Sequence, residues 1–134
     1  MIQSPLSTIA LAATLAESYQ CQLDWYTQLR DTMQQELSRV ILSRGDLSGL
    51  MGSLERKQQL LNTIITERDR VRPHEEQWQK HKGSISVEQA GHVNGILDKI
   101  EVVIRDFLAS EEQLKRYVEN KMPHREINDP DSKS

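Results

Sequence analysis

Three long stretches of helical periodicity, separated by glycines, constrain this chain more than any other feature. The stretches are residues 5–43, 46–82 and 86–121, and Gly45 and Gly83 lie in the gaps between them. Apolar residues recur along each stretch at steps of three and four, which places them on one face of an α-helix. Each helix would be about 55 Å long at 1.5 Å per residue. The sequence therefore predicts an all-α fold built from three long helices.

The short connections predict how these helices pack. Linkers of two or three residues make neighbouring helices antiparallel, and a chain of 134 residues is the size of one ordinary domain. We expect an elongated antiparallel bundle of three long helices, with two stacked helical hairpins as a close variant. Residues 1–122 would form a single helical domain, and the polar residues 123–134 a disordered tail.

The periodicity also predicts which residues form the core. On the first helix they are Leu15, Tyr19, Leu23, Tyr26, Leu29, Met33, Leu37 and Val40. On the second they are Leu47, Leu50, Leu54, Leu61 and Ile65, with Leu60, Ile64, Val71 and Trp78 at the edge of that face. On the third they are Val93, Ile96, Leu97, Ile100, Ile104, Phe107, Leu114 and Val118.

Local signals refine the ends of these helices. Ser4 followed by Pro5 is typical of a helix start, and Pro123 would end the third helix. Because Pro73 has no backbone donor, it predicts a kink in the second helix. The third helix would begin at a capping box, in which the Ser86 side chain pairs with Gln89 three residues later.

The third helix has two further irregularities. Gly91 and Gly95 predict either the close approach of a neighbouring backbone or a simple weakening of the helix. Glu111 and Lys115 occupy positions where the apolar stripe should continue. The last turns are therefore expected to extend past the bundle or to be held only loosely.

The tripeptide Arg44-Gly45-Asp46 has two interpretations. Gly45 can take the left-handed conformation that closes a helix, and Asp46 can cap the next helix by accepting bonds from its first N–H groups. Integrin receptors recognise the same tripeptide, but that function requires a secreted protein with an exposed loop. We favour a helix stop followed by a helix start, because nothing in the sequence indicates secretion.

Charge and cysteine content indicate the compartment and exclude some partners. The formal net charge is −3 with both signs mixed along the chain, so nucleic acid is not an expected partner. The single Cys21 cannot form an internal disulfide, which fits a reducing cytosol. The apolar N-terminal stretch lacks the preceding Lys or Arg of a secretory signal and is too short to span a bilayer. We expect a cytoplasmic protein without membrane insertion.

Residues typical of catalysis or cofactor binding do not form a recognisable pattern. His74 and His81 are seven residues apart on one helix, so they share a face but lie about 10 Å apart, and no third ligand is evident. Acidic pairs such as Glu75-Glu76 are most simply solvated helix faces. A slender bundle also offers no enclosed site in which a pKa would be shifted. We expect no enzymatic activity, no cofactor and no metal.

A three-helix bundle has room for a fourth helix from another protein in the groove between two of its helices. Apolar residues at the edges of the third helix are candidates for this surface: Val102, Val103, Leu108 and Tyr117. The alternative, to which we give equal weight, is that they complete an ordinary core or a homodimer interface.

Several segments resemble the FlgN family of flagellar export chaperones. They are "QLDWYTQLRDTMQQE" in the first helix, "GDLSGLMGSLERKQQLLNTI" after it, and "LKRYVEN" near the end of the third helix. The resemblance covers roughly residues 10–120 and is strongest over 36–64. Glycines in the later helices, at positions 49, 52, 91 and 95, depart from the family pattern.

The resemblance implies a cytosolic chaperone that binds C-terminal helical segments of hook–filament junction proteins and delivers them to the flagellar type III export gate. It also implies a contact between Tyr117 and the export gate, because members use an aromatic residue in their C-terminal helical region. Two alternatives stay open, namely a chaperone for another type III secretion or filament subunit, and a self-associating structural coiled coil.

Overall fold

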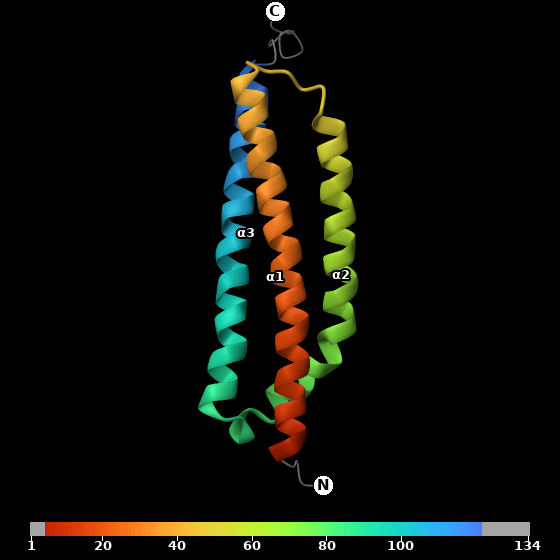
Figure 1. The fold of residues 1–134 in the computed structure, drawn as a ribbon, viewed down its shortest axis with the longest axis vertical. Coiled ribbons are helices and arrows are strands. Elements are labelled where there is room, and N and C mark those ends of the chain that lie inside the picture. Colours follow the sequence, from red (N-terminus) through yellow and green to blue (C-terminus); the bar gives the residue numbers. More distant parts are fainter. Residues whose placement is uncertain (1–4, 122–134) are drawn as a thin grey trace, which may run out of the picture.

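The computed structural model describes residues 5–121, and all of its long elements are helices (Figure 1). Helix α1 spans Pro5–Leu42, α2 spans Leu50–Lys80 and α3 spans Val87–Lys121, with a short 3-10 turn, η1, at Lys82–Ser84. The predicted all-α fold of three long helices is confirmed. The predicted cap at Ser4, the stop at Pro123 and the tail 123–134 lie outside the described residues.

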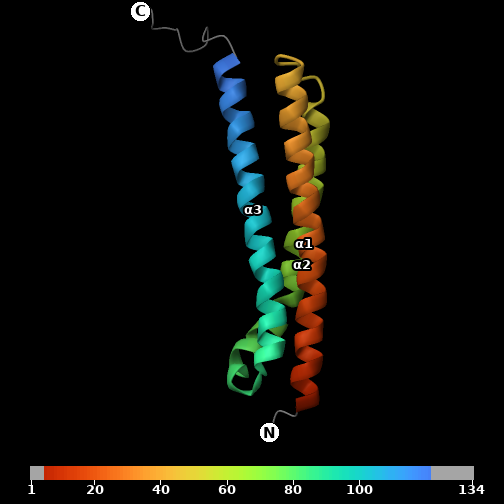
Figure 2. The same cartoon turned by 60° about the vertical axis from the view of Figure 1, so that its left-hand side comes forward.

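Helix α1 is the element on which the bundle is built. It lies against both α2 and α3, whereas close backbone approaches between α2 and α3 are few. Figure 2 shows α3 diverging from the other two helices toward its C-terminal end. The bundle is therefore closed by α1 on one side and more open on the opposite side, between α2 and α3.

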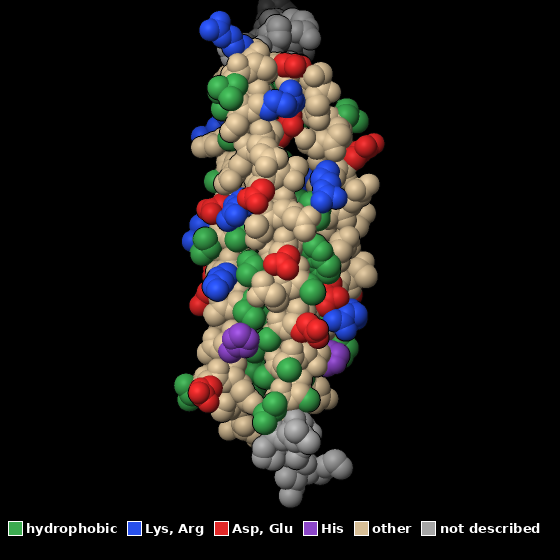
Figure 3. Space-filling view, in the orientation of Figure 1, with side chains coloured by type: hydrophobic (Ala, Val, Ile, Leu, Met, Phe, Trp, Pro, Cys, Tyr) green, Lys and Arg blue, Asp and Glu red, His purple; other side chains and the backbone are tan. Residues whose placement is uncertain are grey.

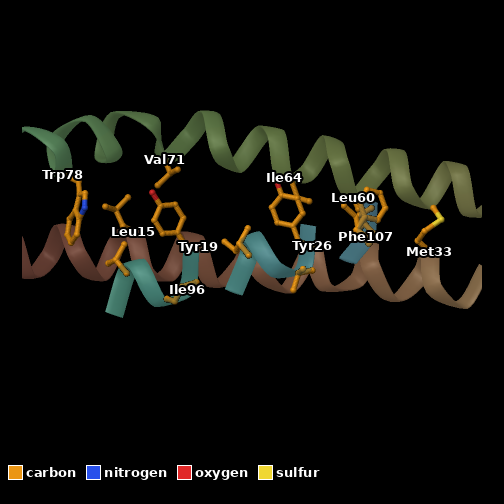
Figure 4. Close-up of a cluster of buried hydrophobic side chains, with 14 of the residues drawn as sticks. Leu15, Tyr19, Tyr26, Met33, Leu60, Ile64, Val71, Trp78, Ile96 and Phe107 are labelled. Atoms are coloured by element: carbon orange, nitrogen blue, oxygen red, sulfur yellow. The ribbon is translucent and has the colours of Figure 1, made fainter. Parts of the chain in front are cut away.

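The predicted core face of α1 is confirmed. Six of its residues are buried, and these are Leu15, Tyr19, Tyr26, Leu29, Met33 and Val40. Leu23 and Leu37 are half-buried and pack against the same cluster. Figure 4 shows several of these side chains between α1 and α2, with Ile96 and Phe107 joining them from α3. One continuous hydrophobic core thus links all three helices.

The predicted core face of α2 is wrong for Leu54 and Ile65, whereas Leu47, Leu50 and Leu61 are half-buried against the core. The buried residues are Leu60, Ile64, Val71 and Trp78, whereas Leu54 and Ile65 are 41% and 52% exposed. The physical reason is what each row meets in the second half of α2. The row of Leu54 and Ile65 continues into Arg68 and Arg72, while the buried row stays apolar from Leu60 to Trp78. Burying the second row removes more apolar surface from water.

Pro73 lies inside α2 without ending it. Figure 1 shows the last turns of α2 bending toward α1, as expected where proline removes a donor and crowds the preceding turn. Trp78, which follows Pro73, is 7% exposed and packs into the core. The bend therefore occurs in the part of α2 that closes over α1.

Most of the predicted core of α3 is confirmed. Val93, Ile96, Ile100, Phe107 and Leu114 are buried, Ile104 and Val118 are half-buried, and Leu97 is 38% exposed. The expectation for the last turns is met in part: Leu114 is buried and Val118 packs against the core, yet the C-terminal end of α3 diverges from the other two helices (Figure 2). Glu111 forms an ion pair with Lys57 of α2, so the charge in the apolar stripe bonds across the bundle.

Of the two features predicted for the corner after α1, the structure has the helix stop but not the cap on the next helix. Arg44 has φ +61° and Gly45 φ +103°, and Gly45 donates a backbone hydrogen bond of 2.8 Å to the carbonyl of Val40, so the left-handed residue that closes the helix is Arg44, one position before the predicted Gly45. Asp46 does not cap α2, which begins at Leu50. Its carboxylate accepts a 2.9 Å bond from the Ser48 N–H, and this local turn replaces the first helical turn. The tripeptide is thus a corner between helices.

The predicted capping box of α3 is confirmed. The Gln89 N–H donates to Ser86 Oγ at 3.0 Å, and the Ser86 N–H donates to Gln89 Oε1 at 3.4 Å. These bonds satisfy donors that a helix N-terminus leaves without partners. They fix the point at which the chain turns back along α1.

Candidate helix-binding surface

The four residues predicted to contact a partner do not form one surface. Val103 is 7% exposed and belongs to the core, which is the alternative given equal weight for these residues. Tyr117 is half-buried and packs against the core cluster. Val102 and Leu108 are 49% and 53% exposed, but a separation of six residues turns them about 120° apart around the helix.

Leu108 belongs instead to a different row of α3. Leu97, Ile104 and Leu108 follow one another at steps of seven and four, which places them on one side of the helix. Leu97 and Leu108 are exposed and Ile104 is half-buried. This row flanks the core stripe on the side away from α1.

A matching row lies on α2. Leu54, Leu61 and Ile65 follow the same steps of seven and four. Leu54 and Ile65 are exposed, and Leu61 is half-buried against the core. The row that was predicted to be the core of α2 is thus an apolar strip at its margin.

The contacts of α2 show that the two rows face the same opening. Arg56 reaches α1 and donates to Gln28 at 2.9 Å, whereas Lys57, one step further round the helix, reaches Glu111 of α3. At about 100° per residue, the direction of rotation around the α2 axis that leads from Arg56 to Lys57 leads next to Leu61 and Leu54. They therefore flank the side where α2 and α3 meet.

The antiparallel register brings the rows level with one another. The Lys57–Glu111 pair places Leu61 about level with Leu108, and Ile65 with Ile104. Six residues thus form what we name the apolar face, namely Leu54, Leu61 and Ile65 of α2 with Leu97, Ile104 and Leu108 of α3. Clustered exposed apolar side chains of this kind are typical of surfaces that bind another protein.

Charged residues border the apolar face on both of its sides. Arg68 and Arg72 continue the row on α2, while Glu101 lies between Leu97 and Ile104 on α3. All three are exposed, and Glu101 pairs with Arg105 at 3.5 Å. Figure 3 shows a different face of the molecule, with positive and negative side chains interspersed along its length. Arg72 is likewise paired with Asp69 at 2.8 Å, so both margins of the apolar face carry paired charges of both signs.

A pocket of about 420 Å³ lies at one end of the apolar face. It is lined from all three helices and the connection between α2 and α3, and Leu97 belongs to both the pocket and the face. At its base Tyr19 donates a 2.6 Å hydrogen bond to Glu75 Oε2. Figure 4 shows the Tyr19 side chain extending from α1 toward α2. Burial and this bond to a carboxylate raise the pKa of Tyr19, so the phenol stays protonated.

The remaining polar candidates are dispersed. His74 is half-buried with no hydrogen-bond partner for Nδ1, and Cys21 is exposed on α1. Among the residues that the structure describes, no three His, Cys, Asp or Glu side chains lie close enough to hold a metal ion. Nor does any helix of residues 5–121 carry an apolar stretch that would cross a bilayer.

The sequence contained a signal for the apolar face that the prediction missed. Two apolar rows on α2 were recognised, but the one that is buried was placed at the edge of the core. The arginines at 68 and 72 lie on the continuation of the Leu54–Ile65 row, and such residues are rarely buried without partners. Taking these arginines into account would have assigned the Leu60–Trp78 row to the core and the Leu54–Ile65 row to its edge.

Comparison with protein-family models, with curated proteins and with solved structures found no match for this chain. The resemblance to FlgN-type export chaperones thus stays a prediction from the sequence segments quoted above.

Proposed function

We propose that this protein is a cytoplasmic, FlgN-like export chaperone. Its clients would be C-terminal helical segments of hook–filament junction proteins, delivered to the flagellar type III export gate. The observation that carries the proposal is the apolar face, where two rows with the same spacing border the open side of a three-helix bundle. A client helix lying there would complete a four-helix arrangement.

The chemistry of the face supports a helical client. An amphipathic helix presents apolar side chains at steps of three and four, and the rows on α2 and α3 repeat at four and seven. A helix destined for a polymer exposes an aggregation-prone apolar side until that side is covered. Covering it in the cytoplasm and releasing it at an export gate is what a chaperone of this class would do.

Calorimetric titration tests the proposal directly. Peptides from roughly the last 40 residues of the host's hook–filament junction proteins, long enough for two or more helices at typical lengths, would be titrated into the folded protein. We expect one-to-one binding with a negative heat-capacity change from apolar burial. If no peptide binds a folded helical sample, the assignment to this class of chaperone is wrong.

Two nearly equally exposed residues of α3 provide a matched control. Leu108 lies on the apolar face at 53% exposure, and Val102 lies off it at 49%. Leu108→Asp should weaken client binding by about tenfold or more, because a charge would be buried under the docked helix. Val102→Asp should leave the affinity unchanged. Equal effects of the two changes would contradict this location.

Self-association on the same face is the competing proposal. A second copy of the chain has the same two rows and would bury them in a symmetric dimer. Sedimentation as a function of concentration distinguishes the two: a monomer leaves the face open for a client, whereas a dimer lost in Leu108→Asp points to a structural coiled coil. A client from another secretion or filament system would instead appear as binding by peptides of those subunits.

The resemblance also assigns Tyr117 to the export gate. Because its ring is half-buried against the core, Tyr117→Phe is the appropriate change, since it keeps the packing and removes only the hydroxyl. Loss of export with unchanged client affinity and unchanged stability would support a gate contact. Unchanged export would show that the hydroxyl is not used there.

A further inference from the structure

The pocket beside Leu97 contains a carboxylate that the apolar face does not need. Glu75 is half-buried and accepts one hydrogen bond, from Tyr19. An ionised carboxylate has about four acceptor positions, so others remain for a donor that enters the pocket. Among the described residues Glu75 takes part in no ion pair within 4.0 Å. The pocket thus presents a carboxylate that has no cationic partner within ion-pair distance.

The other walls of the pocket also suit a cation. Trp78 and Tyr19 contribute aromatic rings to the lining, and aromatic faces attract Lys ammonium and Arg guanidinium groups. Asn94 and Gln79 add polar groups from α3 and α2. An apolar side chain inserted here would remove water from the carboxylate without replacing its interactions, which is costly. An anion would meet the charge of Glu75 directly.

Lys82 is the positively charged residue of the lining. It is exposed in the turn η1 and is the natural competitor for Glu75 when the pocket is empty. Its removal should therefore strengthen the binding of a cation from outside, which is a distinctive consequence of the arrangement.

We infer that this pocket takes the side chain of one Lys or Arg from a helix docked on the apolar face, an inference that rests on the proposed function. Leu97 joins the pocket to the face, so a helix lying along the two rows reaches the pocket at one end. A single ion pair at that end fixes the register and direction of the docked helix, since charge pairs contribute specificity more than affinity.

The pocket is tested first without any client. The probe is N-acetylarginine N-methylamide, with the uncharged citrulline analogue as its control, and the readout is the indole N–H resonance of Trp78. A Trp25→Phe background leaves this as the single tryptophan indole signal, because the chain has two tryptophans. We expect a saturable shift with the arginine probe alone, lost in Glu75→Gln and retained in Glu76→Gln. Glutamine at 75 still accepts the Tyr19 bond, so the fold is preserved.

Lys82→Ala should tighten the arginine probe severalfold. No shift of the Trp78 resonance, or the same shift with the citrulline analogue, would overturn the inference whatever the peptides do. A client peptide then tests the docked register: replacing its anchoring Lys or Arg by norleucine should weaken binding about tenfold in the wild type and little in Glu75→Gln. Peptides that bind through the face but show no such coupling also overturn it, and a complete absence of peptide binding refutes the proposed function instead.

Discussion

Helix α2 carries two apolar rows, of which one is buried and the other is exposed. One row, with Ile64 at 1% exposure, is covered by α1 and α3, and the other, with Ile65 at 52%, stays at the surface. Both have the spacing of a core stripe, and they are adjacent around the same helix. The difference shows that helical periodicity identifies rows that can be buried, while the neighbouring helices select which of them is.

The first prediction tests the difference between the two rows at two adjacent isoleucines. Ile64→Ala should lower the free energy of unfolding by about 2–5 kcal/mol, because it leaves a cavity in a packed core. Ile65→Ala should change it by less than about 1 kcal/mol, as an exposed substitution usually does. Urea unfolding of the two variants is the measurement. Similar losses from both would show that the apolar face is covered in solution, as a homodimer would cover it.

The second prediction concerns the polar contacts on the covered side of α2. The buried Glu36 carboxylate of α1 bonds Arg39 and also accepts a 2.7 Å hydrogen bond from Ser53 of α2. Glu36→Gln should destabilise the fold by about 1 kcal/mol near neutral pH, the usual size for such pairs. A loss indistinguishable from zero would mean that the bond to Ser53 does not connect the helices in solution.

The same carboxylate gives a pH dependence with a defined sign. The hydrogen bond from Arg39, reinforced by that from Ser53, lowers the pKa of Glu36 against the opposing effect of burial. A lowered pKa in the folded state contributes stability above the unfolded-state pKa of about 4.3, and this is lost as the pH falls through the folded value. The stability difference between wild type and Glu36→Gln should therefore shrink in acid. A difference that grows on acidification would contradict this assignment.

The smallest expected effect involves glycines that touch neither row. A Cβ at Gly91 or Gly95 would meet no atom within 4 Å, so a close backbone approach does not explain them. Gly91→Ala and Gly95→Ala should each stabilise α3 by about 0.5–1 kcal/mol, because alanine loses less conformational freedom in a helix. Thermal unfolding measures the gain. Client affinity should not change in either variant, which separates helix stability from the apolar face.

Much of the fold was predictable because the relevant signals are local. The core rows of α1 and α3, the helix stop beside Gly45 and the capping box at Ser86 depend on residues within a few turns of each other. The start of α2 was less accessible: Asp46 has the chemistry of a cap, yet its carboxylate bonds Ser48 instead. A cap on α2 and the observed bond to Ser48 would each satisfy a backbone N–H near the same corner. The residue type of Asp46 alone therefore does not distinguish the two arrangements.

The candidate site was predicted only in outline. A groove between two helices was expected, and Leu108 lies on the apolar face, whereas Val103 and Val102, assigned to the same surface, do not. Their directions depend on how α3 is rotated about its axis, and that rotation is set by the burial of residues such as Phe107 and Leu114 in the core. The α2 half of the face was missed for the same reason.

The sequence by itself determined the number and order of the helices and most of their ends, because spacing, turn residues and caps act within one segment of chain. The tertiary structure decided which of the two apolar rows on α2 is buried and which is left open. It also brought Tyr19, Glu75 and Leu97 to one pocket from three helices. The physical reason is that burial is a property of pairs of surfaces: a row is covered only when another helix has the length, register and complementary side chains to cover it.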